Sequence, residues 1–150
     1  NRKLFKERFK LKYMAIYYFD TSIWLDFFEN RDEPNLPKGE WAHKLLNKII
    51  REDNKIVYSD LNLIELKTRG YSISEIRSMF NDLKKVLVFV ISSDLQRGKS
   101  KDLSAKRNIP KGDALHALIA RDNKAILVTL DHHFQKLPDI IKPYKPQDLT

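Results

Sequence analysis

Apolar and polar residues along the chain form blocks that predict short strands separated by helices. Four apolar runs rich in β-branched and aromatic residues predict buried strands, at residues 15–19, 56–58, 86–91 and 125–130. The closing stretch DIIKPYKPQDL adds a candidate fifth strand at one edge. Strands in this arrangement need helices to cover their apolar faces.

Between these runs, apolar residues recur at helical spacing. The clearest case is residues 40–53, where one face carries Trp41, Leu45, Leu46, Ile49 and Ile50. Further helices are expected at residues 22–29, 60–69, 94–107 and 113–123, after a cap at Ser74, and as a short turn at 131–137. The alternation predicts an α/β fold with a mostly parallel sheet of four or five strands and helices on both faces.

Four carboxylates fall where such a sheet places ligands, beyond the carboxyl ends of its strands. Asp20 follows the first predicted strand directly, and Asp131 follows the fourth. Asp113 opens a predicted helix, and Glu65 lies within the first two turns of another. Because helices in a parallel sheet start at that same edge, the sequence predicts that all four converge.

Each acid also has a structural explanation. The three aspartates suit helix N-caps, which contribute on the order of 1 kcal/mol each. Glu65 shares a helical stripe with Leu61 and Ile64, where a buried carboxylate is costly unless it is compensated, for example by Lys67 or Arg69. The pattern leaves both explanations open.

Clustered carboxylates stay ionised together only near a compensating cation. The chain contains no cysteine, so an oxygen-lined site that suits Mg²⁺ or Mn²⁺ is favoured over a thiolate site. In such sites the metal typically activates water and neutralises phosphate charge. The net charge of +8 favours polyanionic partners, and a lysine- and arginine-rich stretch at residues 99–111 leads into Asp113.

Four motifs together resemble the PIN domain family. They are YYFDTSIWLDF, LIELK, GDALHALIA and LVTLDHHF, and they occur in the order and spacing of that family's acidic motifs. The resemblance covers residues 14–149 and is closest to the toxin subunits of VapBC-type toxin–antitoxin pairs. It implies a three-layer α/β/α sandwich and a Mg²⁺- or Mn²⁺-dependent ribonuclease that cuts single-stranded RNA.

By motif, the resemblance makes Asp20, Glu65, Asp113 and Asp131 the acidic catalytic and metal-site residues, with Ser22 and Thr129 in support. Many relatives carry a further acid two residues after the last one, where this chain has His133. The resemblance also implies an antitoxin protein partner.

The closely spaced aromatic residues Trp24, Phe27 and Phe28 suit either the core or a face for a partner helix or a second subunit, and we expect a homodimer. The lack of cysteine fits a reducing interior, and we expect a cytoplasmic location.

Two other activities fit part of the pattern. A haloacid-dehalogenase-type phosphatase also places Asp after its first strand, but it needs a second Asp where this chain has Ser22. The main alternative is a non-catalytic PIN-like module that binds RNA or protein. Four clustered acids argue against it, because they repel RNA.

The ends of the chain suggest two segments. Residues 1–13 hold six Lys/Arg and one Glu, and we expect them to be a basic extension that need not be native, since Met14 is a plausible start. Residues 14–150 form the expected nuclease domain. The longest apolar runs have six residues, too short to span a membrane.

Overall fold

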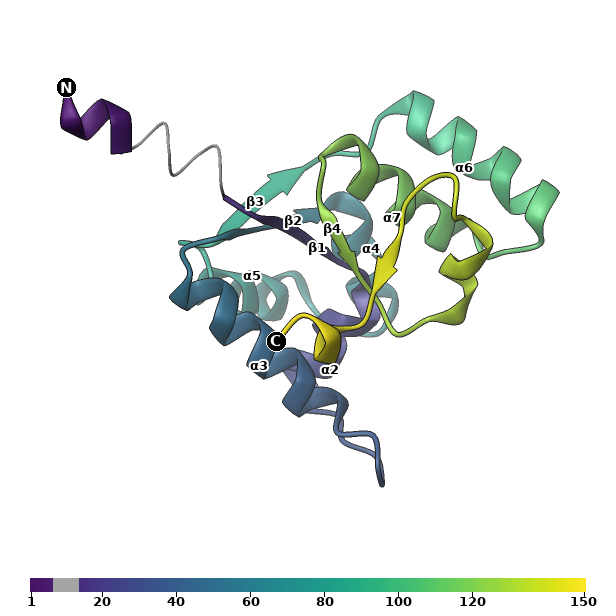
Figure 1. The fold of residues 1–150 in the computed structure, drawn as a ribbon. Coiled ribbons are helices and arrows are strands. Elements are labelled where there is room, and N and C mark those ends of the chain that lie inside the picture. Colours follow the sequence, from purple (N-terminus) through teal and green to yellow (C-terminus); the bar gives the residue numbers. More distant parts are fainter. Residues whose placement is uncertain (7–13) are drawn as a thin grey trace.

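The computed structural model describes residues 1–6 and 14–150 (Figure 1). Residues 2–6 form a short exposed helical segment. The basic residues Arg8, Lys10 and Lys12 of the expected extension lie outside the described residues. The division of the chain at residue 13 therefore stays a prediction.

A parallel sheet forms the centre of the domain, with the strand order β3-β2-β1-β4-β5. Every pairing in it is parallel, and Tyr17 of β1 lies beside Ile56 of β2 and Ile126 of β4. The strands are β1 Ile16–Phe19, β2 Lys55–Ser59, β3 Leu87–Val90, β4 Ile126–Val128 and β5 Pro143–Tyr144. The predicted parallel sheet is confirmed, including the fifth strand at the edge.

Helices cover both faces of this sheet (Figure 1). They are α2 Thr21–Glu29, α3 Lys38–Arg51, α4 Asp60–Thr68, α5 Ile73–Asn81, α6 Asp94–Arg107 and α7 Lys111–Asp122, with 3₁₀ turns η1 His132–Lys136 and η2 Pro146–Asp148. The helices α2, α3 and α5 pack on one face, and α6 and α7 pack on the other. This three-layer α/β/α sandwich is the fold that the sequence predicted.

The core divides into two clusters because side chains of a strand point alternately to opposite faces. Tyr17 and Phe19 of β1 pack against α2, α3 and α5, together with the fully buried Trp24. Tyr18, between them in sequence, packs with α7 in the other cluster. A single four-residue strand thus contributes to both cores.

Some local predictions were wrong. Ser72, and not Ser74, caps α5, in a capping box with Glu75. Ile50 is exposed at the end of the apolar face of α3, and Ile64 of α4 is 58% exposed. The helical stripe that predicted apolar neighbours for Glu65 is therefore largely open to solvent.

The strand order explains where a ligand can bind. The chain leaves β1 toward β2 on one side and returns later to β4 on the other, so β1 and β4 form the switch point of the sheet. Ligands of open α/β sheets bind beyond the carboxyl ends of the strands at such a point. Asp20 directly follows β1 there, and Asp131 lies three residues beyond the end of β4. Among the described residues, none of the helices has both the length and the hydropathy needed to cross a bilayer.

Candidate metal centre

A pocket of about 150 Å³ opens at this switch point. Its lining includes all four acids that the sequence predicted to converge, and it comprises Asp20, Thr21, Ser22, Leu25, Glu65, Arg69, Asp113, His116 and Asp131. We call it the acidic pocket. Helices α2 and α7 begin close to it, and α4 contributes Glu65 from its middle and Arg69 from its C-terminal end.

Asp20 both caps a helix and lines the acidic pocket. Its Oδ1 accepts a hydrogen bond of 3.1 Å from the backbone N–H of Ile23, which caps α2. Its Oδ2 accepts one of 2.5 Å from the hydroxyl of Thr129. Burial raises the pKa of Asp20 to about 6, against these hydrogen bonds that favour the charged form. The structural explanation of Asp20 as a helix cap is therefore confirmed, and its role at a metal site stays a prediction.

Thr129 connects two of the acids. Besides donating to Asp20, its Oγ1 accepts a hydrogen bond of 3.0 Å from the backbone N–H of Asp131. Thr129 is 3% exposed, so its hydroxyl is a fixed part of the interior. The predicted supporting position of Thr129 is thus a physical link between the ends of β1 and β4.

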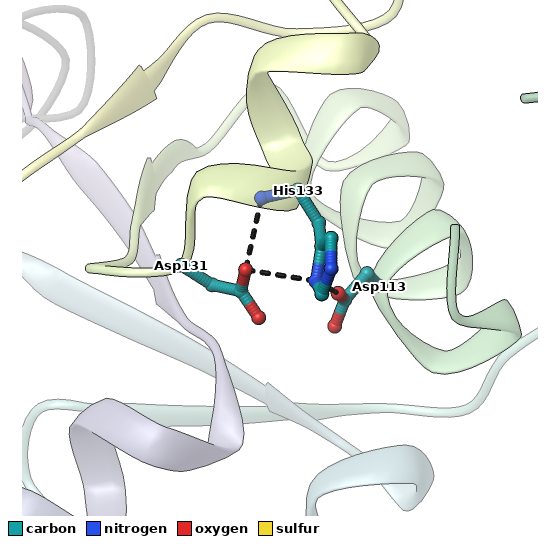
Figure 2. A group of neighbouring side chains, drawn as sticks. All are labelled: Asp113, Asp131 and His133. Carbon is teal, nitrogen blue, oxygen red and sulfur yellow. Dashed lines mark hydrogen bonds and ion pairs between the residues drawn. The ribbon is translucent and has the colours of Figure 1, made fainter. Parts of the chain in front are cut away.

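Asp113, Asp131 and His133 form the tightest group of ligand atoms in the site (Figure 2). His133 Nδ1 lies 3.1 Å from Oδ2 of Asp113 and 2.9 Å from Oδ1 of Asp131. Asp131 also caps η1, since its Oδ1 accepts a hydrogen bond of 2.9 Å from the N–H of His133. One ligand atom from each of the three residues fits within 4.8 Å. Of the described residues, this is the one group with metal-ligand spacing.

Asp113 is not a cap. The helix α7 begins two residues earlier, at Lys111, and follows Pro110. Burial first, and then the neighbouring charge of Asp131, raise the pKa of Asp113 to about 6, against the opposite effect of His116. Burial and a neighbouring negative charge both oppose the ionised form of this carboxyl. A bound cation would stabilise that form strongly, because it replaces the lost hydration and cancels the repulsion.

Glu65 reaches the acidic pocket from α4 and is compensated in a way that the sequence did not suggest. Its Oε1 accepts a hydrogen bond of 2.7 Å from Thr21 and lies 2.5 Å from Nε2 of His116. Burial opposes ionisation, but the bonds from His116 and Thr21 outweigh it and lower the pKa of Glu65. Arg69 also lines the acidic pocket and favours the charged form of Glu65, as one of the two residues expected to compensate it.

Two histidines that the sequence analysis did not place among the site residues lie in or beside the acidic pocket. His133 occupies the position of the further acid found in many relatives, and its spacing two residues after Asp131 was the signal for it. His116 is 2% exposed and lies against Glu65, one helical turn after Asp113. His132, by contrast, keeps its side chain in solvent. The lining is therefore not purely carboxylate, since an imidazole joins the acids.

Other predicted residues differ in how directly they face the acidic pocket. Ser22 lines it. Asp20 and Glu65 line it as well, but they lie outside the tight group of Asp113, Asp131 and His133. In the basic stretch at residues 99–111, Arg107 forms a two-point ion pair with Asp139. That pairing removes one cation from the predicted track for RNA.

The donor set fits a divalent cation. Two carboxylates and an imidazole converge at one edge of the pocket. The buried Asp20 and the half-buried Asp113 both have raised pKa values, and a nearby positive charge would lower them. Carboxylate oxygens suit Mg²⁺ and Mn²⁺ alike, whereas an imidazole ligand favours Mn²⁺.

Comparison with known proteins gives a consistent result. The PIN domain family model matches residues 17–140. The comparison with curated proteins finds no match. Among solved structures, the fold is similar to VapBC2 from Rickettsia felis bound to a DNA fragment from its promoter. That match has a TM-score of 0.63 and 19% identity, and covers 87% of this chain and 100% of that one.

Two further structures are similar over nearly their whole length. A toxin–antitoxin complex from Klebsiella pneumoniae has a TM-score of 0.59 and 20% identity, covering 86% of this chain and 98% of that one. VapBC-1 from nontypeable Haemophilus influenzae has a TM-score of 0.62 and 21% identity, covering 88% and 98%. At these identities the likeness concerns the fold.

Proposed function

Because the chain belongs to the PIN domain family, we propose that it is a Mg²⁺- or Mn²⁺-dependent endoribonuclease that cuts single-stranded RNA. The observation that carries the proposal is the convergence of Asp20, Glu65, Asp113 and Asp131 on one pocket at the switch point of the sheet. An acidic pocket this small repels RNA unless a cation occupies it, so its composition favours metal-assisted hydrolysis over plain RNA binding.

Asp113 and Asp131, with His133 beside them, are the residues that would hold the cation. When bound, a divalent cation supplies Lewis-acid activation of water and charge neutralisation at the phosphate. Asp20, fixed by Thr129 and by the start of α2, contributes a third carboxylate in a set orientation. Arg69 at the wall of the acidic pocket is suited to contact a phosphate oxygen of the substrate.

We further propose that the protein is the toxin of a VapBC-type pair and acts in the cytoplasm, where an antitoxin would block the acidic pocket. The support is the family membership and the similarity to structures that are described as VapBC or toxin–antitoxin complexes. Co-expression with the neighbouring gene, followed by co-purification and loss of cleavage, tests this part.

A homodimer is the oligomeric state that we propose. Apolar side chains are exposed where α4 meets the segment that follows β3, and the two are joined by hydrogen bonds from Ser92 to Asp60. Ile64 of α4 and Leu95 of α6 are 58% and 82% exposed, and Ile91 between β3 and α6 is exposed as well. Ile64→Asp is expected to shift the mass measured by light scattering from dimer to monomer, while Ile73→Asp on α5 serves as control.

The experiment that tests the ribonuclease uses purified protein and labelled single-stranded RNA, with Mg²⁺, with Mn²⁺, or with EDTA. Cleavage that needs the metal and is lost in Asp113→Asn supports the proposal. Cleavage that survives EDTA or Asp113→Asn contradicts the site. RNA binding without cleavage by the wild-type protein would favour the alternative, a non-catalytic binding module.

A further inference from the structure

A chain of buried hydrogen bonds ends on Glu65. The hydroxyl of Tyr18 lies 2.8 Å from Oγ of Ser59 and 2.6 Å from Nδ1 of His116. The other ring nitrogen of His116, Nε2, lies 2.5 Å from Oε1 of Glu65. Ser59 and Tyr18 are fully buried and His116 is 2% exposed, so solvent does not compete for these contacts. The series Ser59–Tyr18–His116 thus connects the end of β2 to the wall of the acidic pocket.

The chain of hydrogen bonds has a direction. A carboxylate can only accept, so the proton between His116 and Glu65 belongs to Nε2. In the neutral imidazole Nδ1 is then an acceptor, and the Tyr18 hydroxyl donates a hydrogen bond to it. Thr21 donates to the same oxygen of Glu65, and its own Oγ1 accepts a hydrogen bond of 3.0 Å from Asn62. Oε1 of Glu65 is therefore held by two donors whose own partners are fixed.

The second oxygen of Glu65 points elsewhere. A Cβ atom at Gly112, at the start of α7, would lie 3.3 Å from Oε2 of Glu65. Asp113 follows Gly112 directly, so Oε2 lies beside the first turn of α7, which carries Asp113. The absence of a side chain at Gly112 leaves room for this oxygen.

We propose that His116 and Tyr18 are positioning residues, which hold Oε1 of Glu65 so that Oε2 faces the cation in the acidic pocket. This inference rests on the proposed metal-dependent function. A glutamate side chain loses rotamer entropy when it is fixed in one orientation. The side chain of Glu65 is 37% exposed, so without these partners it would sample solvent-facing rotamers. Loss of a hydrogen-bond partner that orients a metal-site residue typically lowers the metal affinity 10- to 100-fold.

Two substitutions at one position separate positioning from mere packing. The amide nitrogen of Gln reaches about as far as Nε2 of histidine, whereas the amide of Asn ends near Nδ1. His116→Gln therefore keeps a donor toward Glu65, and His116→Asn keeps only the Tyr18 contact. Both changes place an amide in the same buried site, so their effects on folding are comparable.

Isothermal titration calorimetry measures the Mn²⁺ affinity of the two variants. Thermal melting of the metal-free proteins shows whether both are folded. We expect His116→Asn to weaken the Mn²⁺ affinity by 10- to 100-fold and His116→Gln by less than threefold, at similar melting temperatures. Equal affinities in the two variants would overturn the inference. If neither variant folds, the Mn²⁺ affinities of Tyr18→Phe and Gly112→Ala test the inference instead. We expect each of these substitutions to weaken Mn²⁺ binding at least threefold in a folded protein, and unchanged affinities would overturn the inference.

Failure of the proposed function gives a different result. A wild-type protein that binds Mn²⁺ but cuts no single-stranded RNA contradicts the ribonuclease, and the Gln and Asn comparison still decides the role of His116. A wild-type protein that binds no Mn²⁺ overturns the positioning inference along with the metal site.

Discussion

The hydroxyl of Thr129 donates a hydrogen bond of 2.5 Å to Oδ2 of Asp20, across 109 residues of sequence. The same hydroxyl accepts from the backbone N–H of Asp131. One buried oxygen thus sets the relative position of the first and last acids of the acidic pocket. The contact exists because β1 and β4 are neighbours in the sheet although they are far apart in the chain.

Thr129→Val removes this hydroxyl and keeps the shape of the side chain. We expect the free energy of unfolding to fall by about 1–3 kcal/mol, because the buried carboxyl of Asp20 loses a donor. Cleavage should fall as well, since Asp20 and Asp131 lose their common anchor. Urea unfolding measures the first effect. Thr68→Val is the matched control, because Thr68 is exposed and bonds only locally to Ile64 in α4; equal losses in the two variants would contradict the linking role.

Asp113→Asn is expected to abolish metal-dependent cleavage and to stabilise the metal-free protein. The amide cannot ionise, so the variant avoids both the burial of a charge and its repulsion with Asp131. The gain at pH 7.5 should be on the order of 1–2 kcal/mol in urea unfolding. Asp102→Asn on the exposed side of α6 should change neither property. A destabilised Asp113→Asn protein would show that this carboxylate is compensated from within the chain.

The pH dependence of stability follows from the same shift. The pKa of Asp113 is about 6 in the folded protein and near 4 in the unfolded chain, so between these values the folded state binds more protons. The stability contributed by Asp113 is therefore present below about pH 4 and is lost as the pH rises through 6. Other groups titrate in this range, so the difference between wild type and Asp113→Asn, measured in EDTA from pH 4 to 7.5, is the readout. A difference that stays constant with pH would contradict the raised pKa.

His133→Asp introduces a further acid two residues after Asp131. Three carboxylates then meet where Asp113 and Asp131 now share the imidazole of His133. We expect a less stable metal-free protein, because like charges repel, and a shift of metal preference from Mn²⁺ toward Mg²⁺, because an oxygen ligand replaces nitrogen. The ratio of Mn²⁺ to Mg²⁺ affinities measures this, with His132→Asp as control. An unchanged ratio would show that His133 does not contact the metal.

The sequence by itself determined the architecture and the four acids. Strand and helix periods follow from which faces are buried, so alternating blocks were enough to predict the parallel sheet and the edge where Asp20 and Asp131 emerge. Turn chemistry was less secure, as the capping of α5 by Ser72 shows. Serines two residues apart offer similar local hydrogen bonds, and the packing of Ile76 and Phe80 decides between them.

Only the tertiary structure decided how the acids are held. The partners of Glu65 are Thr21 and His116, 44 and 51 residues away, and its own helix supplies neither. His133 meets Asp113 across 20 residues because η1 folds back against α7. Periodicity reports which side of an element is buried, whereas hydrogen bonds between distant side chains depend on strand order and register. For that reason the sequence located the acidic pocket, and the fold determined the histidines that complete it.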